Sequence, residues 1–166
     1  MSVMGLDVST KSTGWFISKR AMGLITIDPA ASLEDKLCYF RDELVKLLEK
    51  YRPEIVVIED TYLRFHNPLT LKQLARFSGV AIEACARSGA KVKLITATQA
   101  RKNCCGKQGK DFKKPEVFKY FTEKYELTSW KFDEHNDISD AWALAASYKN
   151  NEKQKSIEKK GDKKKK

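Results

Sequence analysis

The chain has 166 residues, 42% of them hydrophobic, which is enough for one domain with a substantial core. Its formal net charge of +10 is uneven, because nine lysines against three acidic residues place +6 within residues 149–166. No charged start followed by an apolar run indicates a signal peptide, and no apolar stretch approaches the ~20 residues of a membrane-spanning helix, so we expect a soluble protein of a reducing compartment.

Three short strands are predicted at the start of the chain. Apolar residues dominate 3–8, 15–19 and 22–27, and short turns separate these segments. Because the connections are so short, the strands should pair as antiparallel hairpins.

A long amphipathic helix should follow these strands. Ser32 is a suitable N-cap residue, with Asp35 three positions later. Apolar residues then recur at steps of three and four, namely Leu33, Leu37, Phe40, Leu44, Leu47 and Tyr51. Pro53 ends the helix, and the apolar run 55–60 predicts a strand that is covered on both faces.

The next helix, 70–87, is apolar on two sides. One side holds Leu71, Leu74, Ala75, Ser78, Ile82 and Cys85, and the other holds Phe77, Val80, Ala81 and Ala84. Such a helix is expected to pack against its own sheet and a second surface, for example another subunit. Gly89 ends it, and residues 91–96 predict a further strand.

The remainder of the chain is basic. Residues 101–119 are rich in Lys and Arg, a helix should start near Pro115, and the last helix should run from 136 to 149. The element order predicts an α/β layer fold with a mixed sheet over residues 1–149. Residues 150–166 are expected to be a disordered Lys-rich tail, either a solubilising end or a nonspecific arm for phosphate backbones.

The four cysteines, Cys38, Cys85, Cys104 and Cys105, show no CxxC spacing, and two histidines are too few for a zinc site with them. Cys38 and Cys85 fall within helical patterns and are expected to be small core residues. Cys104 and Cys105 could instead form a reactive pair.

Four carboxylates carry the chemical information. Asp7 and Glu59 end two predicted strands, where open α/β sheets bind ligands. Asp137 and Asp140 are three residues apart on a predicted helix and can point together. Bare carboxylates about 4 Å apart repel by roughly 4 kcal/mol at an effective dielectric constant of ~20, so convergence calls for a cation. Oxygen ligands favour Mg²⁺ or Mn²⁺ over zinc, and two Mg²⁺ ions could act on a scissile phosphate.

Each acid also has a simpler structural explanation. Asp7 could merely end a strand, and Asp137 could be favoured by the dipole at a helix N-terminus. Glu59, after four apolar residues, and Asp140, within an apolar helix, are harder to explain in this way. Taken together, the four favour a metal-dependent nuclease.

These residues lie in motifs that resemble those of RuvC-type Holliday junction resolvases, in the ribonuclease H-like superfamily. The motifs are Gly5-Leu6-Asp7-Val8-Ser9 with Thr13-Gly14-Trp15, Ile58-Glu59-Asp60-Thr61-Tyr62, and Asp137-Ile138-Ser139-Asp140-Ala141. Leu71-Lys72-Gln73-Leu74-Ala75-Arg76 and Gly79-Val80-Ala81-Ile82 look like the family's interface helix. The resemblance covers roughly residues 3 to 148 and is strongest in the order and spacing of the motifs.

The resemblance implies a ribonuclease H-like five-stranded mixed sheet, three antiparallel strands then parallel ones, flanked by helices. It implies a homodimer, joined through helix 70–87, that makes paired nicks in branched DNA in a bacterial or phage-infected cytoplasm. Asp7, Glu59, Asp137 and Asp140 match the catalytic acids that bind Mg²⁺, with Mn²⁺ as a substitute and two ions per site. Lys114 resembles a basic residue near the scissile strand, and the expected DNA contacts are Tyr62, Arg76, Arg101, Lys102, Lys107, Lys110 and Lys113.

Two departures from the family pattern concern selectivity. The family usually has Pro-Gly after its first Asp, whereas Val8-Ser9 stands here, and the region 104–112 does not align cleanly. In these departures and in its Lys-rich tail, the chain resembles phage members of the family, which cut a broader range of branched DNA.

Three other functions compete with this prediction. Related nucleases with this fold cleave RNA, and a binding-only module could recognise branched DNA without cutting it. Residues 5–10 also look like the first phosphate loop of sugar-kinase-like ATPases, but those enzymes need a second similar domain that 166 residues cannot supply.

Overall fold

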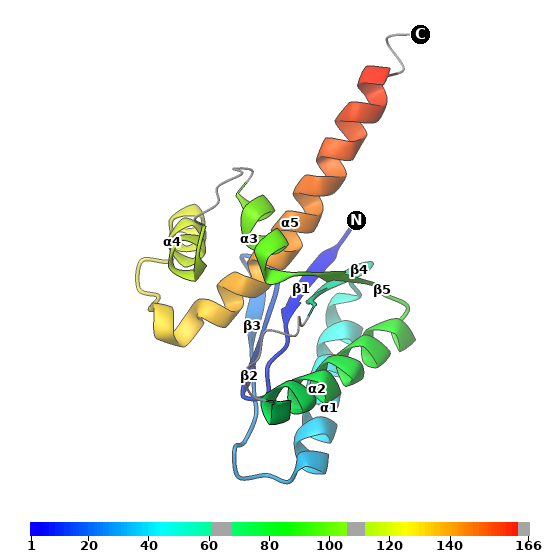
Figure 1. Cartoon of the computed structure of the whole chain (residues 1–166), viewed down its shortest axis with the longest axis vertical. Coiled ribbons are helices and arrows are strands. Elements are labelled where there is room, and N and C mark those ends of the chain that lie inside the picture. The colour runs from blue at the N-terminus through cyan, green and yellow to red at the C-terminus, as the bar shows by residue number, and fades with distance from the viewer. Residues whose placement is uncertain (61–67, 106–111, 163–166) are drawn as a thin grey trace.

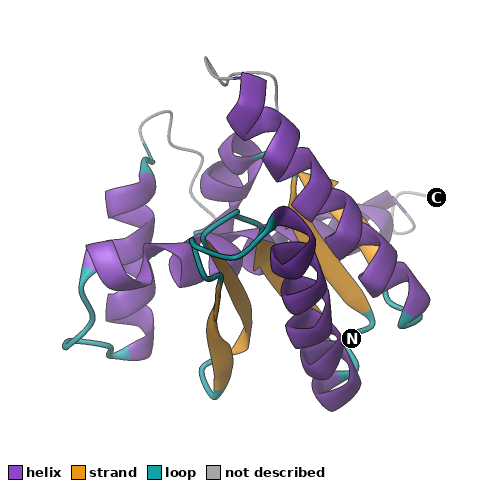
Figure 2. Cartoon of the chain, turned by 90° about the horizontal axis from the view of Figure 1, so that it is seen from below, coloured by secondary structure: helices purple, strands orange, loops and turns teal. Residues whose placement is uncertain are grey.

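The computed structural model describes residues 1–60, 68–105 and 112–162, which form a five-stranded sheet between two layers of helices (Figures 1 and 2). The strand order is β3 (Ala21–Thr26), β2 (Ser12–Ser18), β1 (Val3–Asp7), β4 (Ile55–Glu59) and β5 (Lys91–Ile95). The first three strands are antiparallel, while β4 is parallel to both β1 and β5. The predicted mixed sheet is therefore confirmed.

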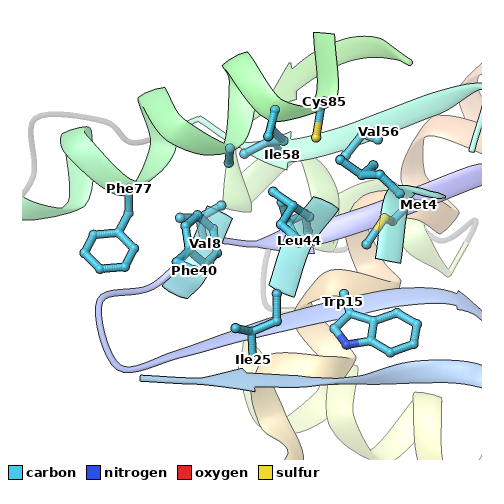
Figure 3. Packing of buried hydrophobic residues seen from close by; sticks show 14 of the residues in the cluster. Met4, Val8, Trp15, Ile25, Phe40, Leu44, Val56, Ile58, Phe77 and Cys85 are labelled. Atoms are coloured by element: carbon cyan, nitrogen blue, oxygen red, sulfur yellow. The ribbon is translucent and has the colours of Figure 1, made fainter. Parts of the chain in front are cut away.

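Helices α1 (Leu33–Tyr51) and α2 (Pro68–Arg87) cover one face of the sheet. Successive strand residues point to opposite faces, so Leu6 and Ile58 reach this side, where they pack with Phe40 on α1 and Phe77 on α2 (Figure 3). The aromatic rings of Phe40 and Phe77 lie 5.3 Å apart between their centroids. This cluster joins the two helices to the sheet.

The ends of α1 form as the sequence predicts. The Ser32 hydroxyl accepts a hydrogen bond from the Asp35 backbone N–H, which satisfies one of the free donors in the first turn. At the other end Arg52 adopts a left-handed conformation with φ of 42°, and Pro53 follows it. The chain thus leaves α1 and enters β4 directly.

Helices α3 (Ala97–Cys104), α4 (Lys114–Tyr125) and α5 (Phe132–Asp162) cover the opposite face. Val57 from the sheet, Phe121 from α4 and Trp142 from α5 belong to the second core cluster. In Figure 1, the end of α5 extends well beyond the rest of the molecule. The three helices contribute most of the charged residues discussed below.

The structure corrects three expectations. Residues 97–104 form α3, a helix that the sequence analysis did not predict and that overlaps the basic segment only at residues 101–104. Helix α5 begins at Phe132 rather than 136 and continues to Asp162, so residues 150–162, expected to be disordered, are helical. Cys38 is exposed rather than buried, whereas Cys85 does lie in the core. Cys38 follows Leu37 by one residue and so lies about 100° from it around the helix, outside the apolar side of α1.

The thiols of Cys104 and Cys105 lie close together, as neighbours in sequence at the end of α3. The Sγ atoms of Cys104 and Cys105 lie 3.4 Å apart. Burial raises the pKa of the Cys104 thiol, so the reactive thiolate is disfavoured at neutral pH. In the described parts of the chain, no helix is both long and apolar enough to cross a membrane.

Candidate active site

The register of β1 and β4 brings Asp7 and Glu59 together. The strands are parallel with Leu6 opposite Ile58, so the next residues, Asp7 and Glu59, emerge side by side at the carboxyl edge of the sheet. Both point toward the α5 side, because side chains alternate and Val57 lies in the core on that side. Each of these two carboxyl groups shifts the pKa of the other, as neighbouring acids do. The pairing expected from the sequence is therefore present.

Two glycines let α5 approach the sheet closely enough to bring in the other two acids. A Cβ atom at Gly5 would lie 1.8 Å from the backbone oxygen of Ala141, and one at Gly14 would lie 2.0 Å from that of Asp137. Real Cβ atoms do not come this near to backbone, so a larger residue would push α5 away. Since Gly14 is also the β-sheet partner of Asp7, the start of α5 is held directly over the edge that carries Asp7.

The four carboxylates form an acidic centre at this edge. Burial raises the pKa of Asp7 well above its ordinary value, and the charges of Asp140 and Glu59 raise it further. Burial also raises the pKa of Glu59, although its interaction with Asp7 opposes that change. For Asp137, burial raises the pKa and Lys114 acts in the opposite direction. Crowding of this kind stores unfavourable energy that a bound cation would relieve.

Lys114, at the start of α4, supplies a positive charge to this centre. Its ammonium group forms an ion pair with Asp140, whose side chain is 8% exposed. Burial alone would lower the pKa of Lys114. The negative charge of Asp140, and after it those of Asp7 and Asp137, outweigh this effect, so the pKa of Lys114 is raised overall. Lys114 therefore remains protonated at neutral pH.

The centre opens into a cavity of about 730 Å³. It is lined by Asp7, Glu59, Asp137, Lys114 and Arg101. Asp140 is not among the lining residues and is paired with Lys114. The cavity has acidic groups at one edge and two cations beside them. This arrangement suits a phosphate group held next to a metal ion.

The donor set fits a hard divalent ion. Asp7 and Glu59 end neighbouring strands and line the same cavity, so a cation held by their oxygens would relieve the repulsion between two adjacent carboxylates. All the donors are oxygens, as Mg²⁺ and Mn²⁺ prefer. Among the described residues, no three His, Cys, Asp or Glu side chains are already arranged as a closed ion cage. The carboxylates thus need small side-chain adjustments to bind an ion.

The other expected DNA contacts are more dispersed. Arg76 is exposed on α2, Lys102 on α3, and Lys113 immediately before α4, and none of the three lines the cavity. Tyr62, Lys107 and Lys110 lie outside the described residues.

The sequence analysis missed one group of cavity residues. Thr96 and Thr98, at the start of α3, line the cavity together with Ser9 and Thr10. Thr96 caps α3 by accepting a hydrogen bond from the Gln99 N–H, and the Gln99 side chain accepts one from the Thr96 N–H. The Thr-x-x-Gln pattern of a capping box was the available signal for α3.

Comparison with known proteins agrees with this geometry. Residues 2–148 match the family model described as crossover junction endodeoxyribonuclease RuvC. The RuvC protein of Lawsonia intracellularis is 30% identical over 114 residues, covering 64% of this chain and 67% of that protein. The protein of Rhizobium johnstonii is 27% identical over 158 residues, covering 90% and 89%.

A solved structure shows the same fold. Thermus thermophilus RuvC, in complex with a Holliday junction substrate, superposes with a TM-score of 0.76 at 15% sequence identity, covering 93% of this chain and 96% of that one. The family match spans nearly all of the described fold and includes Asp7, Glu59, Asp137 and Asp140. This chain belongs to the RuvC family of crossover junction endodeoxyribonucleases and is a junction-resolving endonuclease.

Proposed function

We propose that Asp7, Glu59, Asp137 and Asp140 bind Mg²⁺, with two ions per site and Mn²⁺ as a substitute, to cleave a phosphodiester bond of branched DNA. The observation that supports this most is that neighbouring strands bring Asp7 and Glu59 side by side in the cavity that Asp137 and Lys114 also line. Bound Mg²⁺ would stabilise negative charge on the phosphate and lower the pKa of an attacking water.

Two cationic side chains of the protein would act on the phosphate together with the metal ions. Lys114 and Arg101 line the same cavity as the acids, and the raised pKa of Lys114 keeps its charge at neutral pH. A fixed positive charge near the scissile phosphate stabilises the additional negative charge of the transition state. We assign Lys114 to the catalytic group and Arg101 to substrate binding.

The substrate is branched DNA, chiefly four-way junctions, and also three-way junctions and forks. Thermus thermophilus RuvC, which shares the fold, has been solved with a Holliday junction. Further contacts to the DNA backbone are assigned to Arg76, Lys102, Lys107, Lys110 and Lys113, and base stacking, worth ~1–3 kcal/mol, to Tyr62. We propose that the protein acts in the cytoplasm of a bacterium or a phage-infected cell.

Paired nicks require two active sites, and α2 is the proposed dimer contact. Its inner side packs into the core through Leu74, Phe77 and Ala81. Its outer side leaves the small residues Ala75 and Gly79 exposed one turn apart, where a second helix can approach closely. Residues 1–149 would suffice as the nuclease domain, and the part of α5 that follows residue 149 would be an addition to it.

Cleavage of synthetic DNA tests the proposal. With Mg²⁺, the wild-type protein should nick a four-way junction at paired positions, and Asp7→Asn should reduce the rate at least about 1000-fold, since several kcal/mol of transition-state stabilisation are lost. Binding of the junction by Asp7→Asn should persist in Ca²⁺. Asp133→Asn, an exposed acid in the first turn of α5, is the matched control and should cleave normally. Unchanged cleavage by Asp7→Asn would refute the metal site.

A substrate panel separates this function from its alternatives. Four-way, three-way, flap, linear duplex and RNA–DNA hybrid substrates are compared under the same conditions. Preference for the four-way junction supports the proposal, and preference for the hybrid would favour a ribonuclease. Tight binding without any cleavage would indicate a binding module.

A further inference from the structure

A second, basic cavity lies on the helical face at a distance from the acidic centre. It encloses about 280 Å³ between the C-terminal turn of α4, the end of α3 and the middle of α5. Three lysines line it: Lys124 from α4, and Lys149 and Lys153 from consecutive turns of α5. No carboxylate is among its lining residues within the described chain. Three positive charges therefore face one space without an acidic partner there.

The floor of this cavity is rigid and aromatic. The rings of Tyr120 and Trp142 are stacked with centroids 5.8 Å apart, and the Lys124 nitrogen lies 5.8 Å from the centroid of each ring. Asn150 donates hydrogen bonds from its side-chain amide to the carbonyl oxygens of Asn103 and Cys104, which ties α5 to the end of α3. The lysines thus project from fixed helices rather than from loops.

The cations in the cavity repel one another. Burial lowers the pKa of Lys149, and the nearby charge of Lys153 lowers it further. A negatively charged ligand between Lys149 and Lys153 would remove this repulsion and replace water as the partner of both groups. The cavity is therefore suited to an anion.

Three helices connect this cavity to the active site. Helix α4 carries Lys114 in the catalytic cavity and Lys124 in the basic one, and the ten residue steps from one to the other span about 15 Å at ~1.5 Å per residue. Helix α3 likewise contributes Arg101 to the first cavity and Cys104 to the second. Since each strand of duplex DNA carries one phosphate per 3.4 Å of helix axis, about 4–5 base pairs separate the two cavities.

We infer that the cavity formed by Lys124, Lys149 and Lys153 binds the sugar–phosphate backbone of a DNA arm a few base pairs from the phosphate that is cut. This inference rests on the proposed function, because it takes the DNA in the catalytic cavity as its starting point. The site supplies affinity for the arm, whereas the chemistry remains at the carboxylates. It also gives the part of α5 beyond residue 148, where the family match ends, a role in substrate binding.

Binding of a four-way junction in Ca²⁺ at several salt concentrations tests the inference. The double variant Lys149→Gln/Lys153→Gln should bind roughly tenfold more weakly, and its slope of log affinity against log salt should fall by about 1.8, the value for two lost phosphate contacts. Lys46→Gln/Lys50→Gln on α1 is the matched control, since it removes two exposed lysines at the same spacing from the opposite face of the molecule. That control should leave the affinity and the slope unchanged.

Single-turnover cleavage in Mg²⁺ at saturating protein separates this inference from the proposed function. Lys149→Gln/Lys153→Gln should cleave at the wild-type rate once bound. If the wild-type protein cleaves and the double variant binds with wild-type affinity and slope, the inference is wrong while the proposed function stands. If the wild-type protein does not cleave, the proposed function itself fails.

Protection of the wild-type lysines gives a second readout that needs no variant. Four-way junction DNA should protect Lys149 and Lys153 from acetylation, as measured by mass spectrometry, and should leave Lys46 and Lys50 reactive. Millimolar inorganic phosphate should give little protection. Equal protection by inorganic phosphate alone would indicate a small-anion site and overturn the assignment to DNA.

Discussion

Gly14 on β2 lies directly against the backbone of Asp137 on α5. A Cβ atom at residue 14 would fall 2.0 Å from the carbonyl oxygen of Asp137, and Gly14 is also the strand partner of Asp7. Because residue 14 has no Cβ atom, the start of α5 can approach the sheet closely enough to bring Asp137 next to Asp7. The acidic centre depends on this contact between helix and sheet as much as on the carboxylates.

Gly14→Ala should displace the start of α5 and impair cleavage. Overpacking of this kind costs ~1–3 kcal/mol, and a shift of about 1 Å in a catalytic group can cost about 100-fold in rate. Urea unfolding and junction nicking measure the two effects. Gly23→Ala on β3 is the matched control, because the nearest atoms to its Cβ would belong to the Trp15 side chain, at 3.1 Å, and not to the backbone of α5. Equal nicking by Gly14→Ala and the wild-type protein would show that α5 can move without loss of the site.

The stability of the metal-free protein should decrease as the pH rises. The pKa of Asp7 is raised in the folded state above its ordinary value of 3.8, so the folded protein binds more protons than the unfolded chain over the interval between these two pKa values. Stability is then lost as the pH rises from about 3.8 through the folded pKa, and the full penalty remains above it. Urea unfolding at a series of pH values in EDTA measures this effect.

The variant Asp7→Asn tests whether Asp7 is the group responsible for this pH dependence of stability. The variant should be more stable than the wild-type protein in EDTA at neutral pH, and its stability should depend less on pH. Mg²⁺ should raise the melting temperature of the wild-type protein more than that of Asp7→Asn, because binding to the folded state alone is stabilising. Asp28→Asn, at an exposed turn, is the control. A variant less stable than the wild-type protein in EDTA would contradict the prediction.

Lys114 should contribute to both stability and catalysis. Lys114→Met removes the partner of the buried Asp140 and should lower the free energy of unfolding in EDTA by about 1 kcal/mol, less than for a fully buried pair because Lys114 is 44% exposed. Mg²⁺ should restore this loss of stability without restoring the rate of nicking. Lys114→Arg keeps the charge and should retain part of the activity. Full activity of Lys114→Met would exclude a catalytic role for this residue.

Ala75→Glu should weaken the proposed dimer. A charge buried without a partner at an interface costs several kcal/mol, so the dissociation constant should rise at least about 100-fold. Analytical ultracentrifugation measures the change, and thermal unfolding checks that the subunit remains folded. Ala30→Glu, at an exposed position before α1, is the control. A wild-type protein that is monomeric at all concentrations would exclude the dimer.

Much of the fold follows from local sequence patterns. Alternating and 3.6-residue periodicities, Ser32 as a cap and Pro53 as a stop were sufficient to predict the strands and α1, because short-range contacts dominate these elements. Helix α3 was missed since its apolar pattern is short and its basic residues suggested a loop. The end of α5 was missed because a charged helix offers few apolar residues to the periodicity.

The sequence by itself determined the chemical type of the site: acids at the ends of apolar segments near Asp7 and Glu59 predict a cation, and their order predicts the family. Only the tertiary structure decided that Asp140 faces Lys114, that Gly5 and Gly14 admit the backbone of α5, and that Lys124 joins Lys149 beside an aromatic floor. These relationships join residues far apart in the chain. They depend on how helices pack on a sheet, to within a methyl group, and no local pattern encodes that packing.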